Sequence, residues 1–381
     1  MAPPRLTISP DVRYIVALLL GTRVVLTLIG VIARSLLGSP PHVDWVWVYT
    51  SHRPLLDIWG VADTVWYLDI ANHGYSTVRH DFVQANFVFF PLYPGLMKVV
   101  GAVVGDPYVA GLLVSNAALV VACVFLYKLM LLEDGDSGTA LAAVKYMLLY
   151  PAAFVFSAVL SEGLYLAVII GCFYYVRRRD WRLAGILGFL LSLTRSLGVF
   201  AFLPVVYEYG RSIQWNVRRV RGDVAYLLLI PFGFMLFVGY ETFLTGDVLA
   251  YVHTQEQWAG GTASLKNPLA MLVYGVTLGD VRADLGIFFD LIALMYLCVY
   301  YRKIGFAYWL VGVYSIVLPL AGPWSNLFSL LRYLSVVFPL YLIFARTRSK
   351  SPQQDQVTTI ILAVLQGALM VFWTVGANLP L

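Results

Sequence analysis

Residues 109–132 read Val-Ala-Gly-Leu-Leu-Val-Ser-Asn-Ala-Ala-Leu-Val-Val-Ala-Cys-Val-Phe-Leu-Tyr-Lys-Leu-Met-Leu-Leu, and this stretch decides the class of fold. Its only charged side chain is Lys128. A helix of about 20 apolar residues crosses the roughly 30 Å apolar core of a bilayer. Similar apolar windows lie on both sides of this one. The sequence therefore predicts an all-α, multi-spanning membrane protein.

Apolar windows of this kind predict about eleven crossings in one domain that covers residues 1–381. The clearest are Tyr14 to Leu36, Val109 to Leu132, Ala140 to Leu160, Gly163 to Val176, Val224 to Leu244, Leu285 to Tyr301, Ile304 to Leu320, Leu330 to Ala345 and Val357 to Thr374. The stretch from Leu183 to Tyr207 is interrupted at Thr194-Arg195-Ser196, which predicts two short helices that meet at this break.

The composition excludes an ordinary cytosolic enzyme. Of the 381 residues, 60% are hydrophobic and 12% are charged, whereas a soluble domain has about 25% charged residues. The net charge of +5 fits the basic loops of a membrane protein better than nucleic-acid binding. The cysteines Cys123, Cys172 and Cys298 lie far apart in apolar runs, so we expect packing roles rather than a disulfide framework or a metal site.

The basic clusters predict the orientation, because cytoplasmic loops are enriched in Lys and Arg. With the amino terminus inside, one face receives Arg5 and Arg13, the Arg177 to Arg182 turn, Arg211 with Arg218, Arg219 and Arg221, Arg302-Lys303, and Arg346, Arg348 and Lys350. The acidic turn from Glu133 to Asp136 is an exception on this face. The first helix carries Arg23 and Arg34, so we do not expect a cleaved signal peptide.

This orientation requires that the run Phe87 to Val104 does not fully cross. Its Pro91 and Pro94 favour a re-entrant or interfacial helix. The outer face then has two long segments, residues 38–108 and residues 246–284, and all five histidines fall within them. We therefore expect the polar functional residues to lie on the outer face of the membrane.

The first outer segment places carboxylates among aromatic residues. A helix that starts near Asp63 puts Asp63, Trp66 and Tyr67 on one face and points Asp69 elsewhere. Such a carboxylate can act as a general base or bind sugar hydroxyls while the rings stack on the sugar. In the alternative interpretation, Asp63 merely caps a surface helix.

Charged groups inside a membrane are costly and mark function by default. Arg195 lies at the predicted helix break, and Arg332 lies near the outer end of the tenth crossing. Both guanidinium groups can hold an anionic head group by paired hydrogen bonds. Glu162 falls at an outer turn, and in the alternative interpretation Glu162 or Asp290 only neutralises a buried Arg. For Arg23, Lys145 and Glu241, pairing between helices or snorkelling of the side chain to the membrane surface suffices to explain a charge within the membrane.

The second outer segment contains Gln255 and Trp258 after Thr245-Gly246-Asp247, where a helix start is plausible. An amide and an indole suit a carbohydrate. They equally suit any hydrated membrane interface.

Several short motifs follow one another in order. They are Ala62-Asp63 through Ala71-Asn72-His73-Gly74-Tyr75, Asn86 to Pro94, Pro151 through Ser157 to Ser161-Glu162-Gly163-Leu164-Tyr165, Trp181 through Leu193-Thr194-Arg195-Ser196-Leu197-Gly198, Gly246-Asp247 to Gln255 and Trp258, and Arg332-Tyr333 to Phe338-Pro339. Together they resemble the family of the mannosyltransferase that adds the second mannose to GPI-anchor precursors, with its prokaryotic relatives. The resemblance covers most of the chain from Asp63 to Pro339.

Two departures from the family pattern matter for the site. Val61-Ala62-Asp63 replaces the usual Arg/Lys-Trp-Asp, so either Asp57 or Asp63 is the catalytic aspartate. Ser161-Glu162-Gly163 replaces the more usual Ser-Glu-Ser.

The resemblance implies an inverting glycosyltransferase of the GT-C class, with interfacial helices in its first outer loop. Its donor would be a polyprenyl-phosphate sugar, with mannose as the sugar, and its acceptor a lipid or lipid-linked molecule. The active site would face away from the cytoplasm, at the cell membrane of a prokaryote or the ER membrane of a eukaryote. No nucleic acid is expected as a partner. A lipid phosphate is already a good leaving group, so no metal or other cofactor is expected.

In this scheme Asp63 is the general base that deprotonates the acceptor hydroxyl. Arg332 and Arg195 hold the donor phosphate, and Glu162 orients Arg195 or a sugar hydroxyl. His73 orients Asp63 or helps to bind the phosphate. The expected substrate-binding residues are Arg332, Arg195, Glu162, His73, Trp66, Tyr67, Tyr333, Gln255 and Trp258.

Two other classes of function compete with an enzyme. A lipid or solute transporter or flippase would use charged groups within the membrane as a substrate path, and it predicts internal repeats and functional groups near the bilayer midplane. Neither is visible in the sequence. An assembly protein that has lost its activity would leave the outer carboxylates dispensable.

Overall fold

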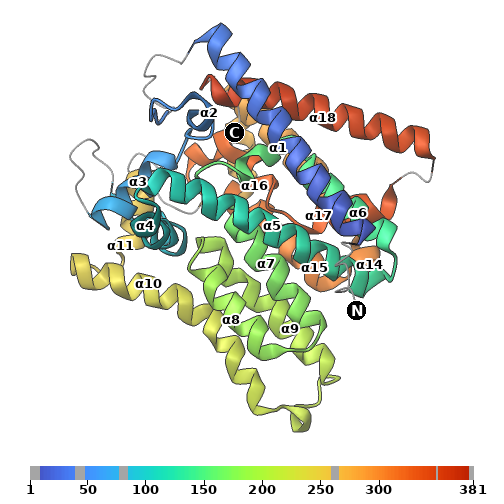
Figure 1. The fold of residues 1–381 in the computed structure, drawn as a ribbon. Coiled ribbons are helices and arrows are strands. Elements are labelled where there is room, and N and C mark those ends of the chain that lie inside the picture. The colour runs from blue at the N-terminus through green and yellow to red at the C-terminus, as the bar shows by residue number, and fades with distance from the viewer. Residues whose placement is uncertain (1–8, 39–47, 77–84, 259–265, 349–350, 377–381) are drawn as a thin grey trace, which may run out of the picture.

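The computed structural model describes residues 9–38, 48–76, 85–258, 266–348 and 351–376. Within these ranges the regular elements are helices, and one isolated antiparallel bridge joins Val48 and Val61 (Figure 1). The expected all-α class is therefore confirmed. Parts of both outer segments, together with Arg5 and Lys350, lie outside the described residues.

Four helices in the described ranges are long and apolar enough to cross a membrane. They are α1 (Pro10–Leu37), α5 (Pro107–Asp134), η4 (Gly222–Leu228) continuing into α10 (Leu229–Thr245), and α18 (Pro352–Thr374). A fifth span is counted if two bent helical segments are taken together. The first is Ser325–Leu334, which includes most of η5 (Trp324–Ser329) and all of α16 (Leu330–Leu334). The second is α17 (Pro339–Thr347), and the bend between the two segments is 47°. Pro339 begins α17, at a position where its missing backbone N–H costs no helical hydrogen bond.

The other expected crossings correspond to helices outside this group, so the total of eleven stays a prediction. These helices are α6 (Ser137–Leu148), α7 (Glu162–Arg177), α8 (Trp181–Ser192), α9 (Phe202–Ser212), α13 (Val281–Val299) and α15 (Phe306–Leu320). One window needs correction, because α6 ends at Leu148 instead of reaching Leu160. Pro151 follows shortly after, where it cannot continue the helix, and η1 (Ala153–Phe156) comes next.

The remaining helices are short and belong mostly to the outer segments. They are α2 (Pro54–Asp57), α3 (Thr64–His73), α4 (Leu92–Val104), η2 (Ser196–Ala201), η3 (Val217–Arg219), α11 (Ala250–Trp258), α12 (Pro268–Thr277) and α14 (Tyr301–Ile304). With 13 residues, α4 is about 20 Å long, which is shorter than the apolar core of about 30 Å. Its length is compatible with the expected interfacial helix, whereas α12 was not expected.

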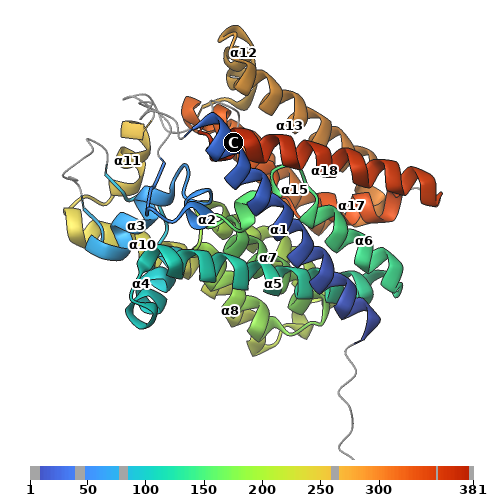
Figure 2. The ribbon, with the colours of Figure 1, turned by 45° about the horizontal axis from the view of Figure 1, so that its top comes forward.

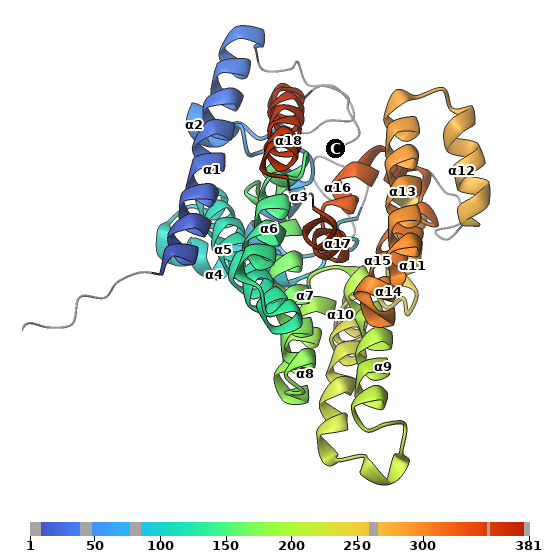
Figure 3. The same cartoon turned by 90° about the vertical axis from the view of Figure 1, so that its right-hand side faces the viewer.

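The helix α7 lies at the centre of the packing, against α5 on one side and α8 on the other (Figure 1). The first and last long helices, α1 and α18, run side by side (Figures 1 and 2). In Figure 3, α1 and α12 lie at opposite edges of the molecule.

Ion pairs join several helix ends. Arg177 at the end of α7 pairs with Glu133 of α5 and, at 3.0 Å, with Glu208 of α9. Arg346 of α17 lies 2.9 Å from Asp134 of α5. We call these five residues the Arg177 network. The acidic turn from Glu133 to Asp136, which is an exception among the basic loops, therefore supplies negative charges that pair with Arg177 and Arg346.

Candidate active site

The carboxylate of Asp63 does not cap its own helix. The helix α3 starts at Thr64, as expected, and Asp63 occupies the capping position, but its side chain accepts no capping hydrogen bond from the backbone. The preceding Ala62 has a φ of +59°, in the left-handed region that favours glycine. Asp63 Oδ2 instead accepts a hydrogen bond of 2.8 Å from Arg332 Nη1. The capping interpretation therefore does not describe this side chain.

Two further charged groups extend this contact into a chain of alternating charges. Arg332 Nε lies 3.5 Å from Glu162 Oε1, and Arg195 Nη1 lies 2.8 Å from the same oxygen. The side chain of Asp63 is 29% exposed, whereas those of Arg332 and Glu162 are 4% and 2% exposed. Among these alternating charges, the carboxylate of Asp63 is thus the most accessible to a ligand.

The ring of Tyr333 lies close to both guanidinium groups. Its centre is 5.2 Å from Arg195 Cζ and 5.3 Å from Arg332 Cζ, within range of cation–π attraction. We call Asp63, Glu162, Arg195, Arg332 and Tyr333 the Asp63 cluster.

Four separate parts of the chain build the Asp63 cluster. Asp63 precedes α3, Glu162 is the first residue of α7, and α16 carries Arg332 and Tyr333. Arg195 lies in the break between α8 and η2, with an extended backbone, as the sequence predicts.

Glu162 is a buried acid that lies between two cations. The charges of Arg195 and Arg332 offset the cost of burying its carboxylate. Its Oε2 is buried and has no hydrogen-bond partner among the described residues. Buried polar atoms are usually hydrogen-bonded, so this oxygen is a free acceptor beside Arg332.

Asp57, the other candidate aspartate, is buried and hydrogen-bonded to the backbone of a neighbouring loop. It is only 4% exposed. Its Oδ1 accepts hydrogen bonds from the backbone nitrogen of Ser51 at 2.9 Å and from the Ser51 hydroxyl, and its Oδ2 accepts one from the backbone nitrogen of Arg53 at 3.2 Å. Asp57 therefore holds the loop before α2, which leaves Asp63 as the aspartate that faces guanidinium groups.

Tyr67 lies beside the Asp63 cluster. Its hydroxyl donates a hydrogen bond of 2.8 Å to Ser161 Oγ. Burial raises the pKa of Tyr67, and the negative charge of Glu162 adds to this effect. Ser161 was not among the expected site residues, although its position directly before Glu162 is a signal that the sequence offers.

Trp66 and Trp258 pack against each other instead of lining an open surface. Their ring centres are 4.9 Å apart, and the ring of Trp66 also stacks on Phe89 at 5.6 Å. Trp66 is 1% exposed, and Trp258 Nε1 donates to the carbonyl oxygen of Ala85 at 3.1 Å. Trp66 is therefore a packing residue in this structure, because other rings cover the face that was expected to stack on a sugar.

His73 and Gln255 have other partners. His73 Nδ1 lies 3.1 Å from Asp69 Oδ1, so His73 pairs with Asp69 and does not orient Asp63 as one of its expected roles required. Gln255 Nε2 donates to the hydroxyl of Tyr251 on its own helix at 3.3 Å.

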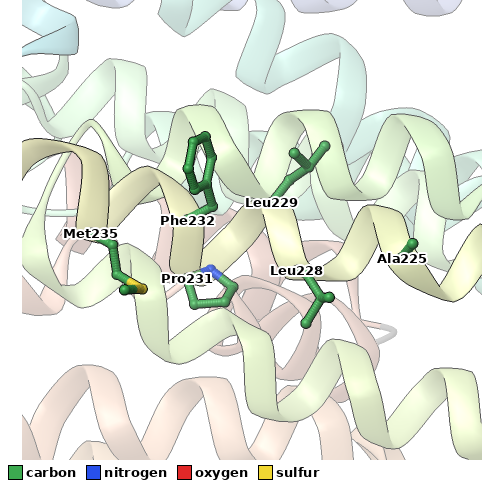
Figure 4. A pocket seen from close by; sticks show the side chains of 6 residues that line it. All are labelled: Ala225, Leu228, Leu229, Pro231, Phe232 and Met235. Atoms are coloured by element: carbon green, nitrogen blue, oxygen red, sulfur yellow. The ribbon is translucent and has the colours of Figure 1, made fainter.

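Apolar pockets lie on the long helices. One is lined by residues of η4 and α10, with Phe232 and Met235 among them (Figure 4). Another lies between Ile29 of α1 and Gly367 of α18. Both are lined by apolar side chains and suit lipid tails better than a sugar. Neither is lined by a member of the Asp63 cluster.

No protein-family model matches the chain, and no curated protein matches it. The geometry of the Asp63 cluster is therefore the basis for a functional proposal.

Proposed function

We propose that the chain is a membrane glycosyltransferase of the GT-C class that moves mannose from a polyprenyl-phosphate donor to a lipid or lipid-linked acceptor. The contact between Asp63 and Arg332 carries this proposal. It joins a partly exposed carboxylate to a buried guanidinium at 2.8 Å, from residues 269 positions apart in the chain. Glycosyl transfer from a lipid phosphate needs these two groups at one place, as a base and as a holder of the phosphate.

The reaction proceeds in one displacement. Asp63 accepts the proton of the acceptor hydroxyl, and the acceptor oxygen forms a bond to the anomeric carbon of the sugar. The bond between that carbon and the phosphate oxygen breaks on the opposite side, and its electron pair leaves with the phosphate. Arg332 and Arg195 offset the negative charge that develops there. The anomeric configuration is therefore inverted.

The contact between Asp63 and Arg332 couples donor binding to the base. Arg332 pairs with Asp63, and a phosphate competes for the same guanidinium. A carboxylate that loses its cationic partner accepts a proton more readily. Donor binding thus activates Asp63, while Glu162 keeps Arg195 beside the phosphate.

The two charged regions support the orientation. Glu162 and Arg177 lie at opposite ends of α7, whose 16 residues span about 24 Å. This length approaches the thickness of the apolar core of a bilayer. The basic loops near the Arg177 network favour the cytoplasmic side. The Asp63 cluster then faces away from the cytoplasm, at the cell membrane of a prokaryote or the ER membrane of a eukaryote.

The test is a transfer assay. The purified protein in lipid nanodiscs is incubated with radiolabelled polyprenyl-phosphate mannose and membrane lipid extracts, and the labelled product is identified. We expect a labelled lipid from the wild-type protein and far less of it from Asp63→Asn. A chelator should leave the rate unchanged, since the phosphate needs no metal in order to leave. If the protein in lipid vesicles instead moves the donor across the membrane and no labelled product forms, the protein is a transporter.

A further inference from the structure

An irregular segment leads into the Asp63 cluster. Between the end of α6 at Leu148 and the start of α7 at Glu162, the chain forms turns and the short helix η1. Residues 152–163 are all buried. Irregular backbone inside a membrane protein is tolerated only where protein or water satisfies its polar groups. We call residues 149–161 the entry segment, because it ends at Ser161, next to Glu162.

The helix α1 supplies part of this support. Arg23 lies near the middle of α1, and its Nη1 donates hydrogen bonds of 3.1 Å to the carbonyl oxygen of Ala153 and of 3.1 Å to Ser157 Oγ. The hydroxyl of Ser157 donates in turn to Asn116 Oδ1 of α5 at 2.9 Å. A charged side chain of α1 thus reaches the backbone of the entry segment.

The helix α18 supplies a second support. Gln366 is 3% exposed. Its Nε2 donates to the carbonyl oxygens of Leu148 at 2.8 Å and Tyr150 at 3.0 Å. Leu148 is the last residue of α6, and Tyr150 directly precedes Pro151, which cannot continue the helix.

The other side of the entry segment contacts the start of α3. The backbone nitrogen of Val159 donates to the carbonyl oxygen of Trp59 at 3.3 Å, and Thr64 Oγ1 donates to the carbonyl oxygen of Val159 at 3.3 Å. Tyr67 then binds Ser161. The entry segment therefore connects Arg23 and Gln366 to the residues around Asp63.

Stability alone does not explain the guanidinium of Arg23. Only 11% of the apolar window of α1 and 22% of that of α18 is buried, yet Arg23 points inward and is 9% exposed. Its Nε and Nη2 have no hydrogen-bond partner among the described residues. A buried charge in a membrane is costly, and an apolar side chain of similar size is often no less stable.

We propose that Arg23 and Gln366 are positioning residues, which hold the entry segment so that Ser161 and Glu162 stay in place beside Asp63 and Arg332. This inference rests on the proposed function. Neither residue touches the reacting groups, so both act through the entry segment.

The test combines amide exchange with kinetics in Arg23→Met, Gln366→Met and the double variant. Matched controls are Thr22→Val on α1 and Thr358→Val on α18, because each hydroxyl donates to a backbone carbonyl of its own helix. We expect amide hydrogen exchange of residues 149–161 to become about tenfold faster in each Met variant and unchanged in the controls. The turnover number should fall by up to about 100-fold, as a displacement of about 1 Å can cause. Arg23→Lys should recover part of the turnover, because an ammonium still donates to Ala153.

The exchange measurement separates this proposal from the transferase itself. Wild-type exchange in both Met variants would overturn the positioning role, as would wild-type turnover in a variant whose entry segment has loosened. If the wild-type protein transfers no mannose, the proposed function fails, while exchange still reports whether Arg23 and Gln366 hold the segment. Should Arg23→Met not fold, Gln366→Met and Arg23→Lys carry the same test.

Discussion

At the scale of single residues, Asp63 and Asp57 are two aspartates with opposite environments. Asp57 is buried and accepts hydrogen bonds from Ser51 and Arg53, whereas Asp63 is partly exposed and faces Arg332. An aspartate that serves as a base needs access to a substrate hydroxyl, which only the second environment offers. Asp57 therefore stabilises a loop, whereas the carboxylate of Asp63 is accessible to a substrate.

The first prediction concerns Asp63→Asn, which keeps the shape of the side chain but cannot take up the proton. We expect the transfer rate to fall by about 10²-fold to 10⁴-fold, with donor binding and folding retained. Single-turnover transfer and donor titration measure the two effects. Asp57→Asn is the matched control, which should lower the melting temperature but retain the rate per folded molecule. Near-normal turnover in Asp63→Asn removes Asp63 from its role.

The second prediction concerns Arg332→Ala. Charge-assisted hydrogen bonds contribute about 1.5–3 kcal/mol each, so donor affinity should fall by at least about tenfold. Arg332→Lys should recover only part of this, because an ammonium cannot form the paired contacts of a guanidinium. Titration with a non-transferable polyprenyl phosphate measures the affinity. An unchanged affinity would refute the phosphate assignment.

At the scale of elements, the start of α7 shows why a glycine follows Ser161 and Glu162. A Cβ atom at Gly163 would lie 2.7 Å from the carbonyl oxygen of Phe156 and 3.2 Å from that of Ser115. Backbone atoms cannot yield as the end of a flexible side chain can. The close approach of the entry segment to α7 therefore requires glycine at this position.

The third prediction is that Gly163→Ser lowers the free energy of unfolding by about 1–3 kcal/mol, which is typical of overpacking. It should also reduce transfer, because Glu162 is the adjacent residue. Thermal unfolding in detergent gives the comparison. Gly95→Ser on α4 is the control, since a Cβ there meets no atom within 4 Å. Equal melting temperatures of the two variants would contradict the close contact.

At the scale of the whole molecule, the Asp63 cluster and the Arg177 network lie at opposite ends of α7. Each joins helices that are distant in the chain. This separation agrees with the proposed topology, in which the basic loops lie on the cytoplasmic side.

The fourth prediction is that these ends lie on opposite sides of the membrane. After Cys298→Ser, which removes the exposed native cysteine, His73→Cys should react with an impermeant maleimide in intact cells. Ser137→Cys, at the start of α6 near Asp134, should react only after the membrane is made permeable. Both original side chains are exposed. The reverse pattern would invert the topology, and labelling of both in intact cells would place them on the same side.

By itself, the sequence determined the all-helical class, the position of most long helices and the break at Arg195. These features depend on runs of neighbouring residues, namely apolar length, proline and local charge, so they can be read along the chain. The meeting of Asp63 with Arg332 was expected from resemblance and not from any local pattern. Only the tertiary structure decided that Asp63 leaves its helix uncapped, that Trp66 is covered and that Arg23 supports a distant segment. Such outcomes depend on which helices pack together, and hydropathy along one helix carries no information about its neighbours.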